Sequence, residues 1–223
     1  LAARLGPVGR ATEGDWLVAD RQSAGRGRQG RVWCDGVGNF MGSTVVHLRA
    51  GDPVAGSLAL VAANAVYAAV ADRLVPPQRA VIKWPNDVMV GRAKLAGTLL
   101  ERVGDTVIVG IGVNLAQAPV VEGRETVALS AFGPPPDRDA FAADLERAFA
   151  AELALWRNSG LSATIARWQA AAHPPGTPLS VSDGSAGRIT GTFAGLDAEG
   201  ALQLALADGT RRTIHAGEVF FAE

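Results

Sequence analysis

A proline- and glycine-rich break near residue 175 constrains the fold of this chain more than any other feature. Residues 173–178 contain three prolines and one glycine. Proline cannot donate a backbone hydrogen bond and disfavours the helical conformation in the preceding residue, so neither a helix nor a central strand continues through this segment. The break divides the 223-residue chain into a large part, residues 1–175, and a small part, residues 176–223. We therefore expect two domains of unequal size.

The hydrophobic pattern predicts an α+β domain followed by a small β-barrel. Apolar runs predict strands over residues 16–19 (a buried one), 40–48, 81–84, 88–90, 94–101 and 106–115. Helices are expected over residues 57–74, 139–158 and 162–172, with Ser57 and Asp139 as N-caps and Gly160 ending the second helix. Residues 1–13 are predicted to form the end of a helix and a loop. Beyond the break, short alternating runs separated by turns, the first at Asp183-Gly184, indicate the barrel.

Composition excludes several classes of protein. Hydrophobic residues make up 48% of the chain and charged residues 19%, which provides a core and excludes wholesale disorder. A net charge of −1 argues against a dedicated DNA-binding protein, and the single cysteine, Cys34, cannot form an internal disulfide. The sequence shows neither a signal peptide nor an apolar run of about 18 residues. We expect a soluble, cytoplasmic, globular protein.

The segment 21–31 is the first candidate for chemistry. It contains four arginines, three glycines and no acidic residue, so it cannot pack as a core element. Backbone N–H groups and guanidinium groups together can hold an anion, and the mutual repulsion of the arginines predicts a mobile lid over a phosphate-containing ligand. The alternative is a solvated basic loop. Although Gly25 to Gly30 matches G-x-G-x-x-G, no helix start follows it, which excludes a dinucleotide-binding site of that type.

The lysines form the second candidate. The chain has 19 arginines but only two lysines, Lys83 and Lys94. A lysine ammonium suits a phosphate or a developing anion, although drift in an arginine-rich composition is the alternative. Lys83 opens the segment Lys83-Trp84-Pro85-Asn86-Asp87. Taken alone, Trp84 is more typical of a core residue than of a ligand contact, and Asp87 is more typical of a carboxylate in a turn. Lys94 interrupts an apolar strand.

Glycines next to these lysines suggest a close approach by a ligand. Gly97 follows Lys94 on the same predicted strand, and Gly112 precedes Asn114 at the end of the next one. A β-bulge at Gly110–Gly112 is the alternative. The three histidines are scattered and no metal-ligand spacing occurs, so the chemistry is expected to be electrostatic and positional.

Taken together, these segments resemble the biotin–protein ligase family. The matching segments are residues 24–33, 83–87, 94–101 and 110–114, in the family's order and at family-like spacing. The resemblance implies a mixed sheet with helices, related to class II aminoacyl-tRNA synthetases, and a C-terminal SH3-like domain. It divides the chain into a biotin- and ATP-binding ligase domain (1–175), whose N-terminal strand is missing, and the SH3-like domain (176–223).

The resemblance also implies a two-step reaction. Biotin and ATP, used with Mg²⁺, would give biotinyl-5′-AMP and pyrophosphate, and a lysine of a biotin carboxyl carrier protein of acetyl-CoA carboxylase or a related carboxylase would then take up the biotinyl group. A lipoate or octanoate ligase and a truncated, non-catalytic biotin-binding protein remain alternatives. No DNA or membrane partner is expected, and a monomer or a homodimer is equally compatible.

The resemblance assigns the family's functional residues to the matching positions of this sequence. Lys94, Arg28 and Lys83 are the implied catalytic residues, and no protein metal ligand is assigned. Lys94 would contact the reacting carboxylate or the α-phosphate, Lys83 the phosphates, Trp33 the adenine face, and Asn86-Asp87 would shape the site or touch Mg²⁺. The implied substrate-binding residues are Gln22, Arg26, Gly27, Arg28, Arg31, Trp33, Asn86, Asp87, Lys94, Gly97, Gly112 and Asn114.

The sequence departs from the family in two places. The family's Ser-Thr-Asn segment, which contacts biotin, is not found, so weaker biotin binding is expected. Gln29 stands where the family commonly has arginine, which removes one cation from the loop.

Overall fold

The computed structural model describes residues 11–182 and 187–222. The predictions for residues 1–10 and for the turn at Asp183-Gly184 lie outside the described residues. Six strands form the larger sheet in the order β1-β2-β6-β5-β4-β3, with every pairing of neighbouring strands antiparallel. The strands are β1 (Trp16–Val18), β2 (Phe40–His47), β3 (Ala80–Lys83), β4 (Asp87–Val90), β5 (Ala93–Val103) and β6 (Thr106–Val113). The predicted strands are therefore confirmed, although β1 is only half-buried.

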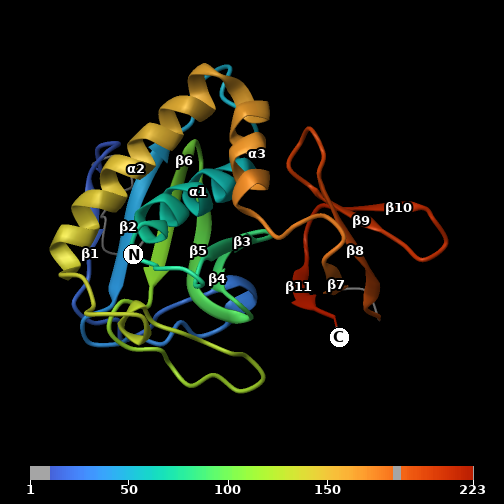
Figure 1. Cartoon of the computed structure of the whole chain (residues 1–223). Coiled ribbons are helices and arrows are strands. Elements are labelled where there is room, and N and C mark those ends of the chain that lie inside the picture. Colours follow the sequence, from blue (N-terminus) through green and yellow to red (C-terminus); the bar gives the residue numbers. More distant parts are fainter. Residues whose placement is uncertain (1–10, 183–186, 223) are drawn as a thin grey trace.

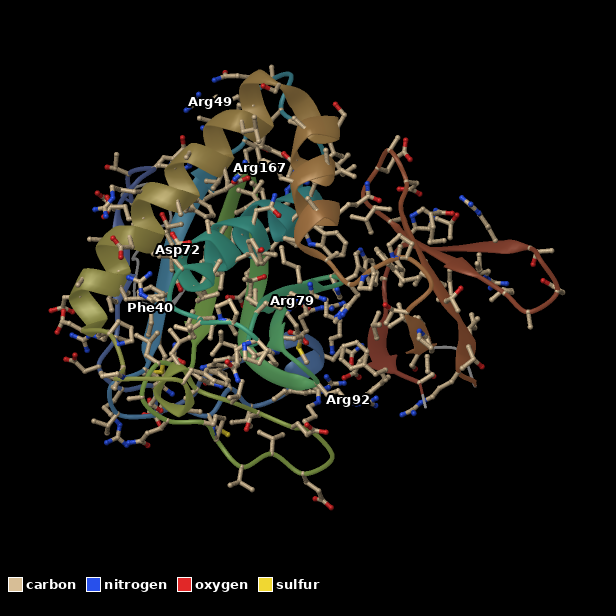
Figure 2. All side chains as sticks on the ribbon, in the orientation of Figure 1. Phe40, Arg49, Asp72, Arg79, Arg92 and Arg167 are labelled. Atoms are coloured by element: carbon tan, nitrogen blue, oxygen red, sulfur yellow. The ribbon has the colours of Figure 1, made fainter. Side chains whose placement is uncertain are left out.

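Three helices cover one face of this sheet (Figure 1). They are α1 (Leu58–Ala71), α2 (Arg138–Asn158) and α3 (Gly160–Ala171). Because side chains alternate along a strand, one set of residues on β2, β5 and β6 points at the helices and the other set points away. The first set builds the main core, which includes Phe40 (Figure 2). The ring centre of Phe40 lies 5.6 Å from that of Phe141 on α2.

The helix ends differ from the prediction. Asp137, and not Asp139, caps α2, because its carboxylate accepts hydrogen bonds from the backbone N–H groups of Asp139 and Ala140 at 3.0 and 2.9 Å. Ser57 precedes α1 but does not cap it, since its hydroxyl donates to the Val54 carbonyl at 2.6 Å. Gly160 begins α3, two residues earlier than expected.

The C-terminal strands form the small SH3-like barrel and stand beside β3 and β4 (Figure 1). Their order is β10-β9-β8-β7-β11. The bounds are β7 (Pro178–Ser182), β8 (Ile189–Leu196), β9 (Leu202–Ala205), β10 (Arg211–Ile214) and β11 (Glu218–Phe221). A second hydrophobic core joins this barrel to the larger part, because Ile82, Trp84 and Trp168 pack in one cluster with Phe193 and Leu204.

Polar contacts reinforce the junction between the two parts. The indole N–H of Trp84 donates to the Gly200 carbonyl at 3.1 Å. The Arg92 guanidinium, at the turn between β4 and β5, lies 5.4 Å from the ring centre of Phe221 (Figure 2). Among the described residues, no helix is long and apolar enough to span a membrane.

Candidate active site

The face of the sheet away from the helices forms the floor of a cavity of about 1160 Å³. Gly110 and Gly112 of β6 and Ser43 of β2 belong to this face. The arginine-rich loop, the residue 116–126 segment and the start of β11 enclose the rest of it. Every residue predicted for the site lines this cavity: Gln22, Arg26, Gly27, Arg28, Arg31, Trp33, Lys83, Asn86, Asp87, Lys94, Gly97, Gly112 and Asn114.

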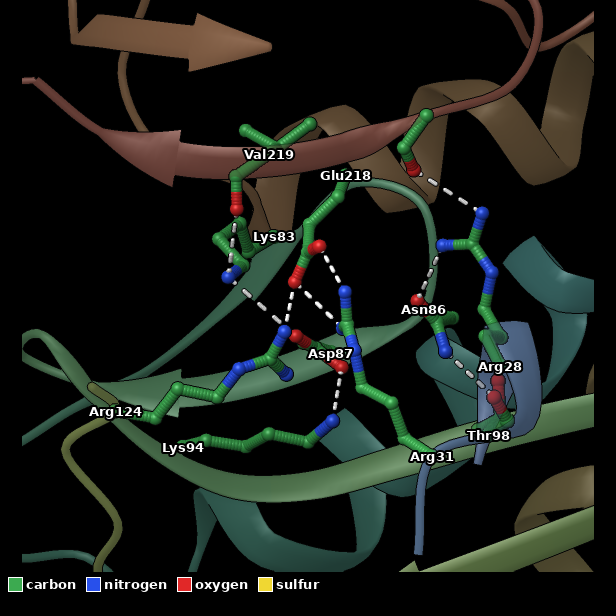
Figure 3. A network of polar contacts seen from close by, with 11 residues as sticks. Arg28, Arg31, Lys83, Asn86, Asp87, Lys94, Thr98, Arg124, Glu218 and Val219 are labelled. Carbon is green, nitrogen blue, oxygen red and sulfur yellow. Dashed lines mark hydrogen bonds and ion pairs between the residues drawn. The ribbon is translucent and has the colours of Figure 1, made fainter. Parts of the chain in front are cut away.

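The arginine-rich loop is a small hairpin. Its two sides are joined by backbone hydrogen bonds from Gly27 to Arg31 at 2.7 Å and from Trp33 to Gly25 at 3.0 Å. At its tip Gln29 adopts a φ of 57°, in the left-handed region. The tip directs the side chains of Arg28 and Arg31 into the site, where both find acceptors within the protein (Figure 3).

A β-bulge aims Lys94 into the cavity. The pairing of β4 with β5 shifts register between Val88 and Met89, so that Leu95 has no partner on β4. An extra residue reverses the alternation of side chains, and Lys94 therefore shares the cavity face with Gly97. A Cβ at Gly97 would lie 2.7 Å from the Lys94 ammonium, so a larger residue there would push the lysine side chain aside. The bulge considered for residues 110–112 does not occur, since β5 and β6 pair in continuous register.

Asp87 holds both lysines at the floor of the site. Its carboxylate lies 2.5 Å from the Lys94 ammonium and 3.4 Å from that of Lys83 (Figure 3). Burial raises the pKa of Asp87, but the charges of Lys94 and Lys83 outweigh burial and hold this pKa below its ordinary value. Burial lowers the pKa of Lys83, against the opposing charge of Asp87. The three side chains form one charged unit with a surplus positive charge.

The start of the last strand closes the site. The Arg28 guanidinium donates to Asn86 Oδ1 and to the Gly217 carbonyl, both at 3.1 Å, and the Lys83 ammonium donates to the Val219 carbonyl at 3.1 Å (Figure 3). Burial lowers the pKa of Arg28, and the Asp87 charge opposes this effect. The barrel thus supplies backbone acceptors to two of the predicted catalytic side chains.

Trp33 and Asn114 form the wall at the end of β6. The Trp33 ring covers Gly112, where a Cβ would lie 2.3 Å from the ring, and the Lys94 ammonium lies 5.5 Å from the ring centre. Asn114 is buried, and its amide N–H₂ donates to the carbonyls of Val127 and Lys94 at 3.1 and 3.4 Å. Among the residues that the structure describes, Asn114 Oδ1 has no hydrogen-bond partner. An aromatic plane next to a cationic site suits an aromatic ligand that carries negative charge.

Two site residues were missed in the sequence. Arg124 and Glu218 form an ion pair inside the cavity, and Glu218 also binds Arg31 (Figure 3). Arg124 lies in a loop-rich stretch without a motif. Glu218 is separated from Arg31 by 187 positions in the sequence, so no local pattern links the two. Glu218 belongs to the C-terminal barrel, and its sequence surroundings carry no motif that indicates a place in the site.

A protein-held magnesium site does not fit these side chains. In residues 11–182 and 187–222, no three His, Cys, Asp or Glu side chains converge as metal ligands. Both carboxylate oxygens of Asp87 face lysine ammonium groups. This arrangement favours the site-shaping role of Asp87 over direct contact with Mg²⁺.

Comparisons with known proteins agree with this geometry. Residues 8–115 match the model of the biotin/lipoate A/B protein ligase family, and residues 182–222 match that of the biotin protein ligase C-terminal domain. A biotin–[acetyl-CoA-carboxylase] ligase of Paracoccus denitrificans is 41% identical over 92% of this chain and 90% of its own length. The bifunctional ligase/repressor BirA of Escherichia coli is 33% identical over 96% of this chain and 68% of its own length.

The structure is similar to that of a biotin protein ligase from Aquifex aeolicus in complex with biotin and ATP. The TM-score is 0.83 at 26% identity, over 95% of this chain and 91% of that one. Sequence and fold thus agree along nearly the whole length, and the chain belongs to the biotin protein ligase family.

Proposed function

We propose that Lys94, Lys83 and Arg28 carry the adenylation step of this ligase. The protein activates biotin with ATP, giving biotinyl-5′-AMP and pyrophosphate, and transfers the biotinyl group to a lysine of a carrier protein. The observation that supports the residue roles is the convergence of four separate sequence segments on one cavity with a surplus of positive charge.

The first step is stabilised electrostatically. A carboxylate oxygen of biotin attacks the α-phosphorus of ATP, and the bond to the pyrophosphate oxygen breaks. Negative charge gathers on phosphoryl oxygens, where fixed ammonium and guanidinium groups stabilise it. Lys94, aimed at the cavity by the β-bulge and held by Asp87, would meet the reacting carboxylate or α-phosphate, while Lys83 and Arg28 would meet the phosphates.

The walls of the cavity would orient the two substrates. Trp33 would pack on the adenine face, and Asn114, which also lines the cavity, would contact the nucleotide. Gln22, Arg26 and Gly27 would line the biotin and phosphate region.

In the second step the amine of the carrier lysine attacks the carbonyl of the mixed anhydride, and AMP leaves. The anhydride hydrolyses readily, so the arginine-rich loop must exclude water until the carrier arrives. We infer that the carrier is the biotin carboxyl carrier domain of acetyl-CoA carboxylase or of a related carboxylase.

Arg28→Gly tests the role of the loop. This change removes the hydrogen bonds to Asn86 and to Gly217, so that the loop stays tied to β11 only through the ion pair of Arg31 with Glu218. We expect adenylate synthesis to persist in part while biotinyl-AMP escapes and labels lysines of a bystander protein. Labelling of serum albumin, measured with and without carrier, checks this outcome. Loss of all synthesis without leakage would show that Arg28 serves only the adenylation step and does not retain the intermediate.

Gly112→Ala tests the role of Trp33. The added Cβ would collide with the indole ring, which must move away from the wall. We expect the KM for ATP to rise about fivefold or more, because base–aromatic stacking contributes on the order of 1–3 kcal/mol. Gly133→Ala is the matched control, since a Cβ there meets nothing within 4 Å. An unchanged KM for ATP would remove Trp33 from the adenine site.

The reaction itself is tested by biotin-dependent exchange of labelled pyrophosphate into ATP. The assay reports adenylate formation and needs no carrier. Exchange with biotin alone is expected, whereas exchange with lipoate or octanoate would identify the other ligase class. Absence of exchange with all three acids would contradict the proposed roles.

A further inference from the structure

Arg124 is fixed to the site by its backbone, although it belongs to none of the matching segments. The chain around it pairs with the first residues of β5: the Lys94 N–H donates to the Glu125 carbonyl at 2.8 Å, and the Val127 N–H donates to the Lys94 carbonyl at 3.0 Å. Thr126 forms a parallel bridge with Lys94. Arg124 therefore keeps a defined position relative to Lys94, and its side chain lines the same cavity.

One carboxylate holds two guanidinium groups at this position. Glu218 Oε1 accepts from Arg31 Nη1 at 2.6 Å and also from Arg124 Nη2, while Oε2 accepts from Arg31 Nη2 (Figure 3). Burial lowers the pKa of Arg124, and the neighbouring charge of Arg31 lowers it further. The guanidinium groups of Arg31 and Arg124 thus lie close together in a partly buried position, with the Glu218 carboxylate between them.

The charges of this network do not balance. It contains five cations, Arg28, Arg31, Lys83, Lys94 and Arg124, but only two carboxylates, those of Asp87 and Glu218 (Figure 3). Asp87 is engaged by the two lysines, which leaves Glu218 as the anion of the arginine pair. The planar fork of a guanidinium binds carboxylate and phosphate oxygens in the same way. The Glu218 carboxylate therefore occupies a place that phosphate oxygens fit.

We propose that Arg124 binds the β- and γ-phosphates of ATP together with Arg31, and that Glu218 is an internal anion that the phosphates displace. The proposal rests on the proposed function, because it assigns the triphosphate of that reaction to this end of the cavity. It implies a competition: Glu218 keeps the arginine pair together in the free enzyme and thereby weakens the apparent binding of ATP and of pyrophosphate.

Two opposite substitutions test the competition in the exchange assay. Arg124→Gln is expected to raise the KM for ATP about tenfold, as for the loss of one charge-assisted hydrogen bond, with the KM for biotin within about twofold of the wild type. Glu218→Gln keeps the shape but removes the charge, and is expected to lower the KM for ATP about threefold or more. In the double variant the decrease in KM caused by Glu218→Gln should be smaller, because Glu218 then competes with phosphate for only one arginine, Arg31. Arg102→Gln, on the exposed end of β5, is the matched control for loss of an arginine.

Direct titration with inorganic pyrophosphate by calorimetry provides a second readout that needs no turnover. Weaker binding in Arg124→Gln and tighter binding in Glu218→Gln support the proposal. An unchanged KM for ATP and unchanged pyrophosphate binding in Arg124→Gln would overturn it. So would weaker binding in Glu218→Gln, because Glu218 would then organise the arginines and not compete with phosphate. Failure of the proposed function looks different: exchange would be absent in the wild type, while the calorimetric ranking of the variants still decides the role of Arg124.

Discussion

Lys94→Gln is expected to slow biotin-dependent pyrophosphate exchange about 100- to 1000-fold, the usual loss when one preorganised group that stabilises an oxyanion is removed. The amide cannot supply the positive charge that the bulge directs into the cavity at Lys94. The effect should fall mainly on kcat, because the charge acts on the transition state more than on bound substrate. Initial exchange rates at saturating ATP and biotin measure this loss.

Two controls separate catalysis from folding for this variant. Arg102→Gln removes an exposed cation from the far end of the same strand and should leave the exchange rate unchanged. Retained biotin binding and a thermal unfolding midpoint near that of the wild type would show that Lys94→Gln is folded. A loss of exchange smaller than about fivefold would contradict a catalytic role for Lys94.

Asp87→Asn is expected to have the largest effect on stability, about 3–5 kcal/mol, because removing one partner leaves buried charges uncompensated. Asp87 is only 8% exposed, and its loss would leave the Lys83 and Lys94 ammonium groups side by side. Since the folded pKa of Asp87 lies below its ordinary value, its stabilisation is present at neutral pH and is lost as the pH falls through that lowered pKa. The difference in unfolding free energy between wild type and variant should therefore be largest near neutrality and shrink below about pH 4.

Urea unfolding at several pH values measures this difference. Asp105→Asn is the matched control: its carboxylate is 89% exposed and lies 3.6 Å from the Arg102 guanidinium, so its loss should change stability little. An equal effect of the two substitutions, or a pH-independent effect of Asp87→Asn, would show that Asp87 is not the central anion of the site.

Much of the fold and most of the site could be predicted from local patterns. Apolar runs separated by turns were enough to predict the strands, because the burial of side chains along a strand is visible in the local sequence. The arginine-rich loop, residues 83–87 and residues 94–101 each carried an unusual set of polar groups, and the family resemblance implied that they contribute to one site. Helix ends were predicted less well, since Asp137 and Asp139 are both good caps and the backbone at Asp137 decides between them.

The remaining features depend on contacts between distant segments. The sequence around Lys94 does not show that β5 carries an extra residue, because the bulge exists only in the pairing with β4. Arg124 acquires its position from backbone hydrogen bonds to β5, and Glu218 from the docking of the barrel. The sequence predicted a small barrel after the proline-rich break, but only the tertiary structure shows that this barrel contributes a carboxylate to the site.

The hydrophobic cluster shared by the two parts limits how the barrel can be exchanged between related enzymes. Ile82 and Trp168 on one side and Phe193 and Leu204 on the other exclude water only together. Exchange of the barrel for that of a distant relative would therefore juxtapose surfaces that never evolved against each other. Successful chimaeras need both sides of the cluster from one parent, even when the crossover point lies in the proline-rich connection.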